Sequence, residues 1–148
     1  MSTLRVDHVT KEYATRGKPL VVLQDVSLML SAGENLAVIG PSGSGKSTLL
    51  SIIGTLERPT SGRIELGGED PFSFDEPALA DFRNHQIGFV FQDHHLLPQC
   101  TLLENVLIPT LADGRPTPEE IERGRELIDR IGLSDRLDYR PAELSGGE

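Results

Sequence analysis

Short apolar runs separated by polar or glycine-containing segments fill the first part of the chain. Residues 4–9 and 21–30 are rich in aliphatic and β-branched side chains, a shorter run of the same kind covers residues 35–39, and residues 63–66 form a short segment between the turn at residues 59–62 and Gly67. Runs of this length between turn residues are typical of β-strands. The pattern therefore predicts a strand at each of these four places.

Helices are predicted between and after these strands. One helix is expected over residues 47–54, and a short one follows Pro77. The continuous apolar run at residues 87–91 predicts one more strand, which ends at Gln92. Strands and helices thus alternate along this part of the chain, as they do in α/β domains.

Beyond residue 98 the pattern becomes helical. Thr101 and Thr117 each stand three residues before a glutamate, which is the spacing of a capping box. The helix predicted after Thr117 carries four apolar residues toward one side, and Gly132 follows where glycine commonly ends a helix. These four residues are Ile121, Leu127, Ile128 and Ile131. We predict an α/β part at residues 1–97 and a mainly helical part at residues 98–148.

Composition limits the classes of protein to consider. The 148 residues carry 14 Lys and Arg against 23 Asp and Glu, which gives a net charge of −9 without clustered basic residues. Nucleic-acid binding needs such clusters, so no nucleic-acid partner is expected. The single cysteine, Cys100, fits a reducing cytoplasm, and no apolar run is long enough to span a membrane.

One polar segment indicates nucleotide chemistry. It follows the apolar run at residues 35–39 and consists of Gly40, Pro41, Ser42, Gly43, Ser44, Gly45, Lys46, Ser47 and Thr48. The spacing Gly-x-x-x-x-Gly-Lys-Ser is that of a phosphate loop, whose backbone N–H groups surround an anion at a helix N-terminus. The segment therefore predicts binding of a nucleoside triphosphate.

Each side chain at the end of this loop has an expected role. Lys46 would lie beside the β- and γ-phosphates, the Ser47 hydroxyl would bind Mg²⁺, and Thr48 would add a phosphate contact. A dinucleotide-binding turn is excluded, because no third glycine follows Gly43 and Gly45 at the required spacing.

The last five residues form a second candidate, which consists of Leu144, Ser145, Gly146, Gly147 and Glu148. A serine hydroxyl and unobstructed N–H groups at a helix start can bind an anion. Glycine pairs also end ordinary loops, so this segment alone identifies no site. Together with the phosphate loop and Gln92, however, it resembles the ATP-binding-cassette (ABC) ATPases, and the resemblance spans essentially the whole chain.

This resemblance implies an α/β fold of the P-loop NTPase type, with a mixed β-sheet core and a mainly helical subdomain, that binds ATP and Mg²⁺. It places Tyr13 where the family has an aromatic residue that stacks on adenine, and Gln92 where a glutamine contacts Mg²⁺ and the attacking water. Residues 144–148 match the signature motif, which contacts the γ-phosphate held by a second copy. A head-to-tail dimer of two ATPase domains follows.

A finer resemblance concerns residues 83–92 and 96–106, which look like the lipoprotein-releasing and macrolide-export branch of the family. That branch implies an ATPase subunit on the inner face of the cell membrane, bound to an integral membrane permease. Asp93, His94 and His95 stand where the branch usually has an aromatic residue and an asparagine, which leaves the substrate open. Adjacent histidines without cysteine or spaced carboxylates do not predict a metal site.

Three groups that such an ATPase needs are missing from the sequence. They are a strand ending in Asp for Mg²⁺, a neighbouring Glu that polarises water, and a later histidine. In the family these groups follow the signature motif. We therefore expect residues 1–148 to be part of a longer domain, to bind magnesium-ATP without turning it over, and to aggregate through unpaired sheet surface. A soluble ABC protein outside transport and a non-hydrolysing nucleotide binder are the alternatives.

Overall fold

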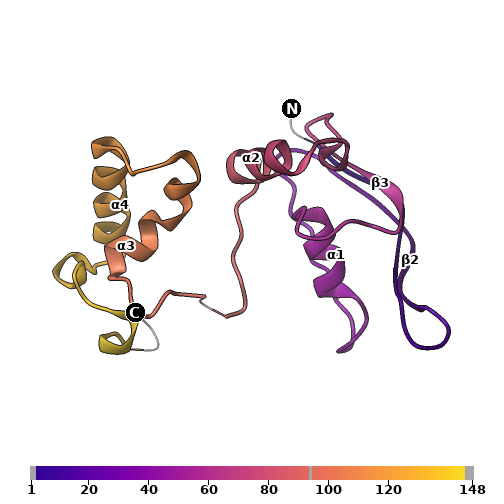
Figure 1. Ribbon diagram of the computed structural model, residues 1–148, viewed down its shortest axis with the longest axis horizontal. Coiled ribbons are helices and arrows are strands. Elements are labelled where there is room, and N and C mark those ends of the chain that lie inside the picture. Colours follow the sequence, from indigo (N-terminus) through magenta and orange to yellow (C-terminus); the bar gives the residue numbers. More distant parts are fainter. Residues whose placement is uncertain (1–2, 94, 146–148) are drawn as a thin grey trace. The chain divides into compact units, whose positions relative to one another are not determined.

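The computed structural model describes residues 3–93 and 95–145. The chain divides into two compact units, Met1–Gly88 and Phe89–Glu148, which are called the first and the second unit below (Figure 1). The domain boundary predicted between residues 97 and 98 lies further along the chain and stays a prediction.

An antiparallel sheet of three strands, in the order β2-β1-β3, forms the base of the first unit. The strands are β1 (Leu4–Tyr13), β2 (Leu20–Leu30) and β3 (Ser61–Leu66). Each of them contains one of the segments predicted to be a strand. The sheet reaches beyond those segments because residues at the strand ends also find backbone partners, as Tyr13 does opposite Leu20.

Helix α1 (Lys46–Ile53) covers this sheet and closes the core of the first unit (Figure 1). Its buried residues Leu49 and Ile52 are three positions apart and therefore lie on one face of the helix. They pack with buried side chains of the three strands, which are Val6, Val9, Leu23 and Ile64. Burial of each large aliphatic side chain stabilises the fold by about 1.5–3 kcal/mol. The prediction of a helix over residues 47–54 is confirmed to within one residue.

The short helix predicted after Pro77 is also confirmed. Helix α2 (Glu76–Gln86) follows the 3-10 turn η1 (Pro71–Ser73), and the Asp75 carboxylate caps it by accepting the N–H of Ala78. Its buried residues Leu79 and Phe82 lie on one face of the helix.

Two predicted strands are not formed. Residues 35–39 and 87–91 pair with none of the strands in the described part of the chain. Ile39 is 89% exposed and Val90 is fully exposed. A strand exists only where a neighbour supplies backbone donors and acceptors. An apolar run indicates that a segment is suited to a β-sheet. It does not indicate whether a neighbouring strand is present to pair with it.

The second unit is helical, as predicted. It contains α3 (Leu102–Leu107), η2 (Ile108–Asp113), α4 (Pro118–Arg130), η3 (Ser134–Arg136) and η4 (Pro141–Glu143). Both predicted capping boxes are present, at Thr101 before α3 and at Thr117 before α4. The buried core of the unit consists of Leu102, Ile128 and Leu133.

Only part of the apolar side predicted for α4 is buried. Ile128 is 1% exposed, whereas Leu127 and Ile131 are 39% and 66% exposed. The buried stripe instead runs through Gly124, where a Cβ would lie 3.2 Å from a methyl group of Leu107. Close approach of α3 therefore selects the face of α4 that is buried. No helix in residues 3–93 and 95–145 is long and apolar enough to cross a membrane.

Candidate nucleotide-binding site

The predicted phosphate loop leads into α1 and lies close to β2. Gly45 caps the N-terminus of the helix with φ of 85°, a left-handed conformation that favours glycine. A Cβ at this position would lie 2.8 Å from the carbonyl oxygen of Val22 and 2.9 Å from a methyl group of Leu23. Glycine is therefore required here both by the backbone angle and by the close approach of the neighbouring strand.

The Lys46 ammonium lies within the curve of this loop. Its Nζ donates to the carbonyl oxygens of Gly40 at 2.9 Å and Pro41 at 2.6 Å, with the hydroxyl of Ser44 at 3.5 Å. The first turn of α1 contains no acidic residue. A fixed cation and the N-terminus of a helix thus face the same loop, and both favour an anion such as a phosphate group.

The hydroxyl groups around the loop suit phosphate and Mg²⁺. Ser42, Ser44 and Ser47 are exposed, and Thr48 is half-buried at the third position of α1. Mg²⁺ takes oxygen ligands and keeps several waters, so one protein hydroxyl together with nucleotide phosphates is a sufficient donor set. The described residues contain no cluster of three or more His, Cys, Asp or Glu side chains that would hold a metal ion by themselves.

Tyr13 lies at the end of β1 and is bound by two charged residues. Its hydroxyl donates to Glu57 Oε2 at 2.9 Å, and the Lys11 Nζ lies 5.1 Å from the centroid of its ring. The same ammonium lies 2.9 Å from Glu57 Oε1. Lys11 and Tyr13 together lower the pKa of the Glu57 carboxyl, and the hydrogen bond from Lys11 is the largest cause. No sequence motif marks Glu57, so sequence reasoning missed it.

Gln92 and the signature segment belong to the second unit. Gln92 is exposed, Leu144 packs against the helical core and Ser145 is exposed. Gly146, Gly147 and Glu148 lie outside the described residues, as does His94. The structure thus brings together the loop residues of the first unit, while the place of Gln92 and Ser145 in the same site stays a prediction.

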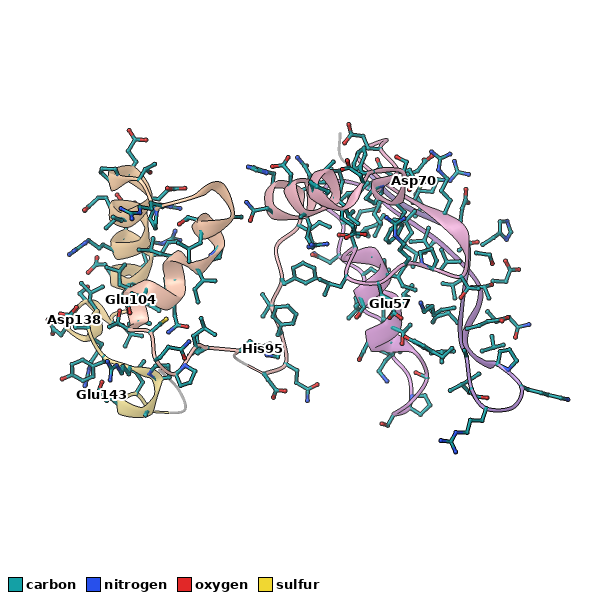
Figure 2. The ribbon with its side chains drawn as sticks, viewed as in Figure 1. Glu57, Asp70, His95, Glu104, Asp138 and Glu143 are labelled. Atoms are coloured by element: carbon teal, nitrogen blue, oxygen red, sulfur yellow. The ribbon has the colours of Figure 1, made fainter. Side chains whose placement is uncertain are left out.

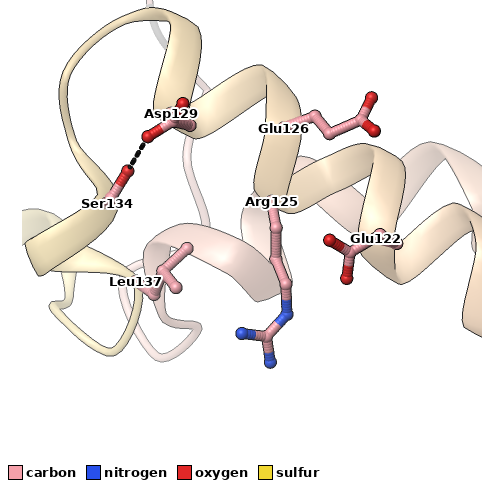
Figure 3. A pocket seen from close by; sticks show the side chains of 6 residues that line it. All are labelled: Glu122, Arg125, Glu126, Asp129, Ser134 and Leu137. Atoms are coloured by element: carbon pink, nitrogen blue, oxygen red, sulfur yellow. Dashed lines mark hydrogen bonds between the residues drawn. The ribbon is translucent and has the colours of Figure 1, made fainter.

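A pocket of about 280 Å³ beside α4 does not suit a nucleotide (Figure 3). Its charged lining consists of Glu122, Glu126 and Asp129 against Arg125, and Ser134 donates to the Asp129 carboxylate at 2.5 Å. The excess of carboxylates would repel a triphosphate. The phosphate loop, and not this pocket, is therefore the candidate nucleotide site.

Comparisons with known proteins identify the relatives of this chain. The lipoprotein-releasing system ATP-binding protein LolD 1 of Rhodopirellula baltica is 55% identical over 145 residues, which cover 98% of this chain and 63% of that protein. The macrolide export ATP-binding/permease protein MacB of Salmonella choleraesuis is 45% identical over 145 residues, which cover 98% of this chain and 22% of that protein. This chain thus spans less than two thirds of the length of either relative.

The fold of this chain also resembles that of a solved structure. The ATP-binding cassette MJ0796, described as a dimer in a post-hydrolysis state bound to ADP and Pi, superposes with a TM-score of 0.86 and 36% identity. The likeness covers 97% of this chain and 64% of the cassette, and it confirms the predicted P-loop NTPase fold class. Residues 23–148 also match the protein family described as "ABC transporter". Since this match includes the phosphate loop and most of the chain, the chain belongs to the ABC transporter family.

Proposed function

We propose that this chain acts within the ATP-binding and ATP-hydrolysing subunit of an ABC transporter that couples ATP to lipoprotein release or export through a membrane permease. One observation carries the proposal. The Lys46 ammonium is held inside a glycine loop, at 2.6 and 2.9 Å from two loop carbonyl oxygens, at the N-terminus of α1. The relatives named for lipoprotein release and macrolide export support the transporter part of the proposal.

Within the site, each element has a distinct task. The backbone N–H groups of the loop and the Lys46 ammonium hold the β- and γ-phosphates, and Tyr13 stacks on the adenine base. Ser47 and Gln92 hold Mg²⁺, which, when bound, neutralises negative charge on the phosphates. Gln92 also orients the water that attacks.

A second copy and a permease complete the proposed assembly. In a head-to-tail dimer, the signature residues Ser145, Gly146, Gly147 and Glu148 of one copy contact the nucleotide held by the loop of the other. The dimeric description of the solved cassette supports the formation of a dimer. The assembly would lie on the inner face of the cell membrane, where an integral permease binds the two ATPase domains.

We also propose that residues 1–148 bind the nucleotide without hydrolysing it by themselves. The sequence contains no apolar strand ending in Asp-Glu after the phosphate loop. Without a carboxylate to polarise water, the bound phosphates are positioned but no base activates the nucleophile.

Titration calorimetry with magnesium-ATP tests the binding proposal. We expect Lys46→Ala to weaken binding at least about tenfold, which corresponds to about 1.4 kcal/mol. Lys18→Ala is the matched control, because it removes the same charge from the exposed loop between β1 and β2. Equal affinities of the two variants would contradict the proposal. Steady-state phosphate release by residues 1–148 that Lys46→Ala abolishes would contradict the proposed lack of turnover.

A further inference from the structure

We propose that Glu57 is a positioning residue that fixes the Tyr13 ring relative to α1, and thereby determines how strongly the base of a purine nucleoside triphosphate is recognised. The inference rests on the proposed stacking of Tyr13 on the base. It concerns the base alone, since the phosphates are assigned to the loop and Lys46.

The Glu57 carboxylate uses each of its oxygens to hold a different partner. Oε1 lies 2.9 Å from Lys11 Nζ, and Oε2 accepts the Tyr13 hydroxyl at 2.9 Å. Charge-assisted hydrogen bonds of this kind are stronger than those between neutral groups. The Lys11 side chain is 14% exposed, and that of Glu57 is 30% exposed, so both charged side chains are partly shielded from solvent.

The ring of Tyr13 is held at two places. Its hydroxyl is bound by Glu57, and the Lys11 ammonium lies over the ring at 5.1 Å from the centroid, which is within the range of a cation–π contact. The residue nevertheless remains 36% exposed. A base that stacks on the exposed side therefore meets a ring whose orientation is already fixed, and less conformational freedom is lost on binding.

Backbone contacts connect this network to the helix that carries Lys46. The N–H groups of Leu56 and Glu57 both donate to the carbonyl oxygen of Ser51 in α1, at 2.9 and 3.3 Å. Lys11 Nζ also donates to the Arg58 carbonyl oxygen at 2.8 Å. Figure 2 shows Glu57 beside α1. The segment after α1 thus ties the end of β1 to the helix that begins at Lys46.

This linkage predicts that Glu57 affects the binding of the base and not the binding of the phosphates. Stacking of a base on an aromatic side chain needs a positioned ring, whereas tripolyphosphate needs only the loop. Loss of the Glu57 carboxylate should therefore weaken binding of ATP and leave binding of tripolyphosphate unchanged.

The test compares magnesium-ATP with magnesium tripolyphosphate by titration calorimetry on the purified protein. We expect Glu57→Gln to weaken ATP binding about three- to tenfold, because a charged acceptor is replaced by a neutral one, and to change tripolyphosphate binding less than about twofold. Glu12→Gln is the matched control, since it removes one negative charge from β1 beside Tyr13 and should change neither affinity. Lys11→Met keeps the aliphatic part of the side chain and should weaken the binding of ATP but not that of tripolyphosphate. It replaces the Glu57 variant in the test if that variant does not fold.

Tyrosine fluorescence gives a second readout that a merely structural role would not move. The sequence has 2 Tyr and 0 Trp, so Tyr139→Phe leaves Tyr13 as the single fluorophore of this type. ATP should quench its emission, tripolyphosphate should not, and Glu57→Gln should reduce the quenching at saturating ATP.

The outcomes separate this inference from the proposed function. Equal losses of ATP and tripolyphosphate binding in Glu57→Gln, or no loss of either, would overturn the positioning role while nucleotide binding stands. A wild-type protein that binds ATP no more tightly than tripolyphosphate would overturn the stacking of Tyr13 and the inference together. A wild-type protein that binds neither ligand would overturn the proposed function itself.

Discussion

The side-chain amide of Asn105 binds both backbone groups of Leu97. Its Oδ1 accepts the Leu97 N–H at 2.8 Å, and its Nδ2 donates to the Leu97 carbonyl oxygen at 3.2 Å. The same Nδ2 lies 3.1 and 2.9 Å from the carbonyl oxygens of Cys100 and Thr101. Asn105 is only 9% exposed. Its buried amide thus supplies hydrogen bonds to backbone groups of the loop that precedes α3.

Replacement of this amide should destabilise the second unit. Asn105→Leu keeps the approximate size of the side chain but removes the partner of the Leu97 N–H and of the Cys100 carbonyl oxygen, whereas the carbonyl oxygens of Leu97 and Thr101 keep a backbone donor. We expect a loss of about 1–3 kcal/mol in the free energy of unfolding, measured by urea denaturation. Gln99→Leu is the control, because it makes the same kind of change at an exposed position of the same loop. If both variants lost equal stability, the amide network would not be the cause.

Local signals predicted the helices well, whereas two strands that would need a distant partner were predicted and are not formed. The capping boxes at Thr101 and Thr117 need only residues three positions apart, and both are formed. Residues 35–39 and 87–91 have the apolar composition of strands, but no described strand pairs with them. Pairing is a property of two segments and cannot be read from one.

The candidate site shows the same division. The spacing from Gly40 to Lys46 predicted the phosphate loop, because all residues of that motif lie within one short segment of the chain. Glu57 reaches Tyr13 across 44 positions of the chain, and no local pattern marks such a contact. The resemblance to the ABC family indicated Tyr13, but only the structure shows what holds its ring.

Two glycines of the phosphate loop should differ in their response to substitution. Gly43 and Gly45 have similar φ angles of 79° and 85°. A Cβ at Gly43 would meet nothing within 4 Å, whereas one at Gly45 would lie 2.8 Å from the Val22 carbonyl oxygen. We expect Gly43→Ala to cost about 1–2 kcal/mol from the backbone angle alone, and Gly45→Ala to cost about 1–3 kcal/mol more from overlap with β2.

Thermal unfolding of the two variants measures this difference. Because both substitutions add the same methyl group to one loop, each is the control for the other. Equal melting temperatures would mean that the loop shifts away from β2 at little cost, and that close approach to Val22 does not determine its position.

The capping box of α4 should make stability depend on pH. The Glu120 carboxylate accepts the Thr117 N–H at 2.7 Å, and hydrogen bonds from Thr117 lower the pKa of Glu120 from 4.5. Because the pKa of Glu120 is lowered in the folded state, its carboxylate stabilises the fold above pH 4.5. This stabilisation disappears as the pH falls through the pKa that Glu120 has in the folded state. Glu120→Gln should therefore make the free energy of unfolding depend less on pH. Urea unfolding between pH 3 and 6 measures this dependence, since this is about the range in which such a carboxyl titrates. Glu119→Gln, in the same turn but outside the box, should leave this dependence unchanged, and an equal decrease in both variants would contradict this role.

A histidine on the sheet should show the opposite pH dependence. His8 Nδ1 lies 2.6 Å from Asp25 Oδ1, and both residues have positive φ angles, of 49° and 55°, where β1 and β2 lose regular register. The hydrogen bond that the His8 ring donates to the Asp25 carboxylate is the largest cause that raises the pKa of His8 above 6.5, and Asp7 contributes least. The contribution to stability is therefore complete below pH 6.5 and disappears as pH rises through the raised folded value. NMR titration of the His8 ring should show that Asp25→Asn lowers its pKa toward 6.5, whereas Asp7→Asn shifts it much less. Similar shifts in both variants would mean that the general field of the acidic surface, and not the pairing across the two strands, determines the protonation of His8.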